Sequence, residues 1–321
     1  MTDIPWSITS LAQLAILLEV SSPKPGNVNR LRRFSDTGYR HFMASASLMG
    51  RGLHECALRG AHLGKLEIQP SEIRLGELIH QCAKDVFGGL NKRNTILGTI
   101  LFYVPLVVCA AAAISSDSKF TVDKTRFWLK KVIISTTVED TISMYKSFHL
   151  ANPAGEMKRE STIWTDVHDR FDIQNPRVYE NIQEDQLTLI DLFELSADVE
   201  PIAKEWSDYF ELTLTKVFPH LDSLVHDLEN IEEGIVRTFV WLLSIQPDGL
   251  IMKKVGIQKA VEIQQLAATI ITEGKLDSDS DEILSELDHI LRSDGNQLNP
   301  GTTADFISAA ILCKLFTLTY P

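Results

Sequence analysis

One segment, residues 96–114, is almost entirely apolar and constrains the fold more than any other part of the chain. Its length is close to the roughly 20 residues that a membrane-spanning helix needs. Pro105 interrupts it, Thr95 and Thr99 lie on its first turns, and we expect no second span in the chain. A helix that is apolar all round and stays out of a membrane must be covered by other helices. We therefore predict a buried central helix and no membrane insertion.

Apolar residues recur at helical spacing in most of the chain, for example at Leu11, Leu14, Ala15 and Leu18. The same spacing predicts helices at residues 39–59, 73–82, 123–134, 138–150, 185–195, 199–217, 221–244, 257–273, 280–292 and 303–318. The β-branched run 132–138 is too short to indicate a sheet. The sequence therefore predicts an all-α fold in which residues 1–321 form a single large multi-helix domain.

The polar stretch 151–181 contains glycine, two prolines and several aspartates, and it has little apolar periodicity. We expect a long loop or a subdomain junction there.

Composition and charge exclude several classes of protein. With 44% hydrophobic and 23% charged residues, the chain has the composition of a globular protein. A net charge of −12 argues against a general nucleic-acid-binding protein, because such proteins bind phosphates through clustered lysine and arginine. The four cysteines form no CxxC pair, and no secretion signal opens the chain. We expect a cytoplasmic protein.

The first polar motif is Ser22-Pro23-Lys24-Pro25-Gly26-Asn27. Its two prolines fix the backbone on either side of Lys24, and Gly26 permits a backbone path that other residues avoid. Such a turn holds a lysine rigidly, as a phosphate-binding site requires. A stiff turn between helices that carries a solvent-exposed lysine explains the same pattern, so both interpretations stay open.

The second motif is Leu298-Asn299-Pro300-Gly301-Thr302-Thr303-Ala304-Asp305. Thr302 and Asp305 have the spacing of a capping box at the start of the last helix. The functional alternative uses the same physics, because free amides, two hydroxyls and a carboxylate also suit a phosphate or the Mg²⁺ bound to it.

Three further motifs carry polar residues next to predicted helices. In the segment 91–98, Asn94 and Thr95 open the apolar helix and are expected to face the interior, although Asn94 also suits a helix cap. In the segment 246–256, Asp248 lies in a turn before Lys253 and Lys254, which also reads as an Asp-Gly turn with solvated lysines. Asp140, in the pair Glu139-Asp140, is an ordinary surface residue unless it turns inward.

In their order, these segments resemble the triphosphoribosyl-dephospho-CoA synthase family, all-α proteins that make the prosthetic-group precursor of citrate and malonate lyases. The matching segments are Glu19-Val20, Lys24 to Gly26, Asn94 to Gly98, Pro247 to Gly256 and Leu298 to Asp305. The archaeal-type branch is more similar, because it shares the segments 36–42 and 151–155. The citrate-lyase type differs at Asn29, Ile96 and Leu97, which leaves the acceptor open.

The resemblance implies transfer of the triphosphoribosyl group of ATP, with release of adenine, to the ribose 2′-hydroxyl of dephospho-CoA. It implies that ATP brings Mg²⁺. Catalytic or metal-binding roles would fall on the carboxylates Asp305, Asp140 and Glu19, with Asp305 and Asp140 as the metal ligands. Substrate-binding roles would fall on Lys24, Gly26, Asn27, Asn94, Thr95, Asp248, Lys253, Lys254, Asn299, Thr302 and Thr303.

Two alternatives stay open. One is a related nucleotide-using transferase or hydrolase in cofactor biosynthesis that acts on a different acceptor. The other is a non-catalytic helical scaffold in which turns and caps explain each motif separately. The sequence gives no oligomeric state.

Overall fold

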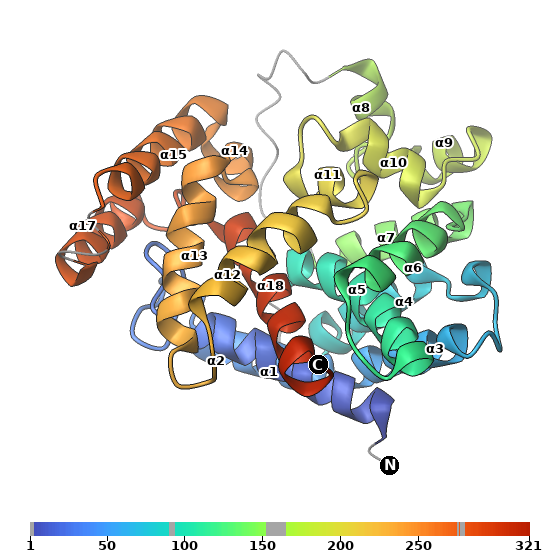
Figure 1. The fold of residues 1–321 in the computed structure, drawn as a ribbon. Coiled ribbons are helices and arrows are strands. Elements are labelled where there is room, and N and C mark those ends of the chain that lie inside the picture. Colours follow the sequence, from blue (N-terminus) through green and yellow to red (C-terminus); the bar gives the residue numbers. More distant parts are fainter. Residues whose placement is uncertain (1–2, 90–93, 152–164, 275, 277–279) are drawn as a thin grey trace.

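The computed structural model describes residues 3–89, 94–151, 165–274, 276 and 280–321. Within these residues the chain is helical and contains no strand. Figure 1 shows the helices packed around one another, with the last helix, in red, crossing the first helix, in blue. The prediction of an all-α fold is confirmed.

The helices follow one another closely along the chain. Their bounds are α1 Ile4–Ser21, α2 Tyr39–Leu48, α3 Gly50–Gly64, α4 Leu75–Phe87, α5 Leu97–Asp117, α6 Val122–Ile134, α7 Val138–Ala151, α8 Asp166–Arg170, α9 Val178–Glu184, α10 Leu189–Ser196, α11 Pro201–Ser207, α12 Phe218–Leu224, α13 Ile231–Ile245, α14 Gly249–Val255, α15 Ile257–Thr272, α17 Ser280–Arg292 and α18 Gly301–Thr319. Two short turns complete the list, the 3₁₀ turn η1 Pro70–Glu72 and the π-helical turn η2 Thr213–Val217.

Helix α5 is the predicted buried helix, because every residue from Thr99 to Ile114 is buried. Helices α1, α3, α4, α6 and α18 surround it. The backbones of α3 and α5 approach closely, since a Cβ atom added at Gly60 would lie 2.2 Å from the carbonyl oxygen of Val108. One hydrophobic cluster joins side chains from α1 through α18 around this helix.

The expectation that α5 is alone in having the length and composition of a membrane span is wrong. Helices α1 and α18 are also long and apolar enough, and the bent pair of α13 and α14 passes the same test when taken together. The apolar stretches of α5 and α18 are 94% and 78% buried inside the protein, against 39% for α1. Other helices thus cover the apolar surface of α5 and α18.

Three of the predicted helices are divided in the structure. The segment 39–59 changes direction at Met49 to give α2 and α3, and the segment 225–230 separates α12 from α13. The segment 199–217 breaks at Tyr209 and Phe210, whose φ angles are 52° and 60°. These breaks depend on local contacts that apolar spacing does not show.

The carboxylate of Glu205 stabilises the break between α11 and η2. Its two oxygens accept hydrogen bonds of 3.0 Å from the backbone N–H groups of Leu212 and Thr213, which begin the next helical segment. Burial raises the pKa of Glu205 to about 7, although these hydrogen bonds oppose the rise.

The expected junction at residues 151–181 is described only in part. Residues 152–164, with the motif 152–155, lie outside the described residues, and α8, α9 and the turn between them follow from residue 165 onward. The cations Lys92 and Arg93 of the third motif also lie outside. The single-domain organisation stays a prediction.

Candidate active site

The ends of several helices meet on one side of α5. Helix α18 contacts α1, α5 and α14. The start of α14 is in tight contact with two other segments, because a Cβ atom added at Gly249 would lie 2.9 Å from Pro201 Cδ and 3.0 Å from Thr302 Oγ1. Residues far apart in sequence, from α1, α5, α11, α14 and α18, are thereby brought together.

Asp305, close to the start of α18, is half-buried and lies near other carboxylates. The hydroxyl of Thr99 donates a hydrogen bond of 2.6 Å to Asp305 Oδ1. Burial raises the pKa of Asp305 to about 8, and the nearby carboxylates of Glu19 and Asp248 raise it as well, against the lowering effect of Thr99. The residue keeps some accessible surface. Asp305 is therefore largely protonated at neutral pH and able to exchange a proton with a ligand.

Gly98 lets Asp305 reach α5. A Cβ atom at position 98 would lie 1.9 Å from Asp305 Oδ2, which is far inside van der Waals contact. This close contact explains why the Asn-Thr-x-x-Gly segment ends in glycine.

The carboxylate of Asp248 accepts hydrogen bonds from the first residues of two helices, α14 and α18. One carboxylate oxygen caps α14, where it accepts hydrogen bonds from the N–H groups of Leu250 and Ile251. The other accepts from the N–H of Thr303 at 2.6 Å and from its hydroxyl at 2.8 Å. Both Thr303 donors are therefore used within the protein, and Asp248 occupies part of the place where a phosphate was expected.

Lys24 lies inside the protein. Its side chain is 0% exposed, and its Nζ forms an ion pair of 2.9 Å with Glu19 Oε1. The same ammonium group donates to the carbonyl oxygens of Glu19 and Ser22. The buried ammonium group is thus engaged within the protein, and Lys24 fixes Glu19 instead of reaching a phosphate. The exposed lysine of the simpler interpretation is not found either.

Glu200, just before α11, also belongs to this region but was not singled out from the sequence. Lys253 Nζ lies 3.9 Å from Glu200 Oε1, and the two side chains are 28% and 30% exposed. Burial raises the pKa of Glu200, Lys253 lowers it and Asp248 raises it. Only the following Pro201 marked this position, as a helix start. We call Glu19, Glu200, Asp248 and Asp305 the carboxylate cluster.

The Lys-Pro-Gly-Asn turn connects the end of α1 to α17 and α18. The N–H of Gly26 donates a 2.7 Å hydrogen bond to Asp288, and Asn27 Nδ2 lies 3.4 Å from the carbonyl oxygen of Pro300. Gly26 has a φ of 72°, a backbone conformation that favours glycine. Gly26 and Asn27 therefore position the turn.

The remaining predicted ligands differ in accessibility. Asn299 is half-buried and has a buried Oδ1 with no hydrogen-bond partner among the described residues, whereas Thr302, three residues further on, is buried. Lys254 donates to the carbonyl and side-chain oxygens of Asn296 at 2.6 and 3.0 Å, and burial lowers its pKa. Asn299 is thus better placed for a ligand than Lys254.

The start of α5 differs in part from the expectation. Asn94 is exposed instead of facing the interior, and its Oδ1 accepts a 3.4 Å hydrogen bond from the N–H of Leu97, as a capping residue would. Thr95 is half-buried, and its hydroxyl lies 2.7 Å from that of Ser45.

Asp140 turns inward, where it contacts backbone and hydroxyl groups at the starts of α4 and of its own helix and no other carboxylate of the site. Its Oδ1 accepts a 2.8 Å hydrogen bond from the N–H of Gly76 at the start of α4, and its Oδ2 accepts from the N–H and hydroxyl of Thr137. These hydrogen bonds fasten α7 to α4, and they do not bring Asp140 to the carboxylate cluster.

Replacing Gly98 by Ala is expected to displace the Asp305 carboxylate, because the new methyl group overlaps it. Misplacing a reacting group by about 1 Å costs on the order of 100-fold in rate. We expect a loss of that size in kcat with little change in thermal stability. Gly89→Ala is the matched control, since a Cβ atom there would meet nothing within 4 Å. Equal rates for the two variants would remove this role of Gly98.

Asp140→Ala is expected to lower stability without affecting the reaction per folded molecule. The change leaves the buried N–H of Gly76 without its acceptor, which costs about 1–3 kcal/mol. Urea denaturation measures the loss of stability, and the turnover rate at 15 °C, where the variant stays folded, measures kcat. A stable Asp140→Ala protein that has lost its activity would show that Asp140 takes part in the reaction.

Comparison with models of protein families shows one match. Residues 5–320 match the family model described as ATP:dephospho-CoA triphosphoribosyl transferase. A comparison with curated protein sequences gave no match. Among solved structures, a proposed triphosphoribosyl-dephospho-CoA synthase from Archaeoglobus fulgidus is similar, with a TM-score of 0.53 and 23% identity over 81% of this chain and 97% of its own. At this identity the structural similarity supports the fold.

Proposed function

Because the chain belongs to the ATP:dephospho-CoA triphosphoribosyl transferase family, we propose that its reaction takes place at the carboxylate cluster. The chain is an enzyme of this family and transfers the triphosphoribosyl group of ATP to dephospho-CoA. The observation that carries the proposal is the position of Asp305, whose carboxyl accepts a hydrogen bond from Thr99 and lies against Gly98 at the start of α5. Burial, with a smaller effect of Glu19 and Asp248, raises the pKa of this carboxyl to about 8.

In the proposed reaction a hydroxyl of the acceptor ribose, the 2′-hydroxyl, attacks the anomeric carbon of ATP. The new C–O bond forms while the bond to adenine breaks, and adenine leaves with the bonding electrons and takes up a proton from water. Asp305, in its ionised form, accepts the proton of the attacking hydroxyl as general base. The positive charge that develops on the sugar is stabilised by the carboxylate of Glu19, which Lys24 holds in place.

The triphosphate needs positive charge, because ATP carries about four negative charges and the protein has a net charge of −12. Lys253 and Asn299, which are partly exposed, are the groups proposed to bind it, together with the hydroxyl of the buried Thr302. Among the described residues, no three His, Cys, Asp or Glu side chains are arranged to hold a metal ion. Mg²⁺ usually keeps its waters and binds phosphates plus one or two carboxylates, so the site suits Mg²⁺ that arrives with ATP, with Glu200 as the protein ligand. Bound there, the ion would neutralise phosphate charge.

Two finer assignments belong to the proposal. The family match supports dephospho-CoA as the acceptor. The substrates ATP and dephospho-CoA, together with four buried free cysteines, support a cytoplasmic enzyme.

The purified protein, incubated with ATP, Mg²⁺ and dephospho-CoA, tests the proposal by the release of adenine. Adenine that appears only when the acceptor is present, together with a product whose mass equals dephospho-CoA plus the triphosphoribosyl group, is the expected result. Adenine release that is independent of the acceptor would indicate a hydrolase. Absence of release despite ATP binding would indicate a different acceptor.

The rate is expected to depend on pH through Asp305. Below a pH of about 8 most of the Asp305 carboxyl is protonated, so the fraction available as base rises about tenfold per pH unit and levels off above pH 8. A profile of kcat/KM from pH 6 to 10 should therefore rise and reach a plateau. A profile that falls above pH 8 would show that the protonated form, a general acid, is the active one.

A further inference from the structure

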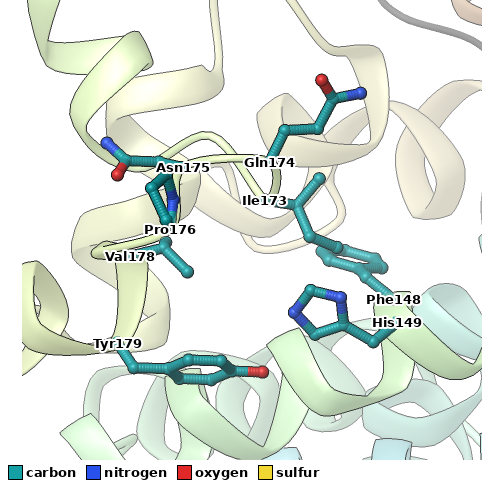
Figure 2. Close-up of a pocket in the computed structure, with 8 residues that line it drawn as sticks. All are labelled: Phe148, His149, Ile173, Gln174, Asn175, Pro176, Val178 and Tyr179. Atoms are coloured by element: carbon teal, nitrogen blue, oxygen red, sulfur yellow. The ribbon is translucent and has the colours of Figure 1, made fainter.

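A cavity of about 440 Å³ lies between the end of α7 and the start of α9. Its walls are Phe148 and His149 of α7, the turn of Ile173, Gln174, Asn175 and Pro176, and Val178 and Tyr179 at the start of α9, as Figure 2 shows. This size is typical of sites for small molecules. It shares no residue with the carboxylate cluster, so the reaction described above does not use it.

The cavity is aromatic and carries no carboxylate, lysine or arginine among its lining residues. In Figure 2 the imidazole of His149 and the ring of Tyr179 face the space beneath the turn, while Ile173 and Phe148 close one side. The centroids of the His149 and Tyr179 rings are 5.9 Å apart. A phosphate group would find no lysine or arginine among these lining residues, which favours an uncharged portion of a ligand.

The walls are held in place by hydrogen bonds that leave two polar groups free. The hydroxyl of Tyr145 donates to the carbonyl oxygen of Phe171 at 2.5 Å, and Asn175 Nδ2 donates to that of Asp169 at 2.9 Å. Within the described part of the chain, the ring nitrogens of His149 and the hydroxyl of Tyr179 have no hydrogen-bond partner. Burial raises the pKa of Tyr179, so its hydroxyl stays a neutral donor.

Helix directions place the cavity at the same end of the molecule as the carboxylate cluster. Gly76 and Asp140 join the starts of α4 and α7. Further along, Lys146 of α7 lies close enough to His80 of α4 to lower its pKa, after burial as the main cause. The two helices therefore run alongside in one direction. Near the end of α4, Asp85 pairs with Arg51 at the start of α3. Just before α3, the hydroxyl of Ser45 of α2 contacts that of Thr95, close to Gly98 and Asp305.

We propose that this cavity binds the pantetheine arm of the acceptor dephospho-CoA, an inference that rests on the proposed function. The adenine of ATP must lie at the cluster, because its glycosidic bond breaks there. The adenine of the acceptor is attached to the ribose that carries the reacting hydroxyl, so it lies there too. The pantetheine arm is the one uncharged portion of either substrate that extends away from the reacting atoms. Its two amides match the free hydrogen-bonding groups of His149 and Tyr179.

Calorimetric titration of dephospho-CoA and of ADP, which lacks the arm, tests the proposal independently of turnover. Tyr179→Ala should weaken dephospho-CoA binding about 10- to 100-fold and leave ADP binding unchanged. His149→Ala, at an exposed position that is safe for folding, should weaken dephospho-CoA binding about 3- to 10-fold. Phe127→Ala is the control, because Phe127 is an exposed aromatic residue on α6 that does not line the cavity.

Two results would overturn the assignment. Equal losses of dephospho-CoA and ADP affinity would show that the cavity holds the nucleotide part, and unchanged affinities in both variants would show that it holds neither. A wild-type protein that binds dephospho-CoA through Tyr179 and releases no adenine would instead contradict the proposed reaction while supporting the cavity.

Discussion

Asp305→Asn is expected to lower kcat by about 10²–10⁴-fold, the usual contribution of a general base. The amide keeps the size of the carboxyl and can still accept the hydrogen bond that Thr99 donates to Oδ1. It cannot accept a proton from the attacking hydroxyl. Because Asp305 is largely protonated at neutral pH, its neutral replacement should leave stability and ATP binding nearly unchanged.

The control for Asp305→Asn is Asp85→Asn on α4. Asp85 pairs with the exposed Arg51, so its replacement should leave the rate unaltered. Single-turnover release of adenine, with both substrates saturating, measures the chemical step directly. An Asp305→Asn enzyme that retains the wild-type rate would remove the assignment of Asp305 as the base.

Lys24→Met is expected to destabilise the protein by about 3–5 kcal/mol, because it leaves a buried carboxylate without its partner. Lys24 and the side chain of Glu19 are 0% and 7% exposed, so water cannot replace the lost ammonium. The unfolding free energy in urea measures the effect. Arg177→Met is the control, since that residue pairs with Glu180 on the surface and such pairs contribute less than about 1 kcal/mol.

The double variant Lys24→Met with Glu19→Gln separates stability from function. Removing both charges should restore most of the lost stability, as a buried ion pair often can be replaced without loss. The double variant should nevertheless stay nearly inactive, because the neutral amide cannot stabilise positive charge on the sugar. Recovery of both stability and activity would make the pair structural only.

Much of the fold could be predicted from the sequence, because the position of each helix follows from the spacing of apolar residues within that helix alone. The apolar run at residues 96–114 allows no exposed face, and it is buried in the structure. The breaks at Tyr209 and Phe210 could not be predicted, since they depend on the carboxylate of Glu205 reaching the next helical segment. Apolar spacing contains no information on such contacts.

The sequence predicts which segments form the site better than it predicts what each residue in them does. Spacing cannot tell which partner a polar group meets after folding. Thr303 suits a phosphate in the sequence and meets Asp248 in the structure, and Lys24 meets Glu19. Asp140 carries the same carboxylate as Asp305, but it lies on α7 and contacts the start of α4. Glu200 joins the cluster through tertiary contacts that no motif records.

A crystal structure of the Asp305→Asn protein with ATP, Mg²⁺ and dephospho-CoA tests the placement of the reaction most directly. The account predicts the anomeric carbon of ATP beside residue 305, with the acceptor hydroxyl about 3 Å from its side chain and the carboxylate of Glu19 facing the sugar. A nucleotide bound beside Asp140 and Gly76, or anywhere apart from the start of α18, would contradict it.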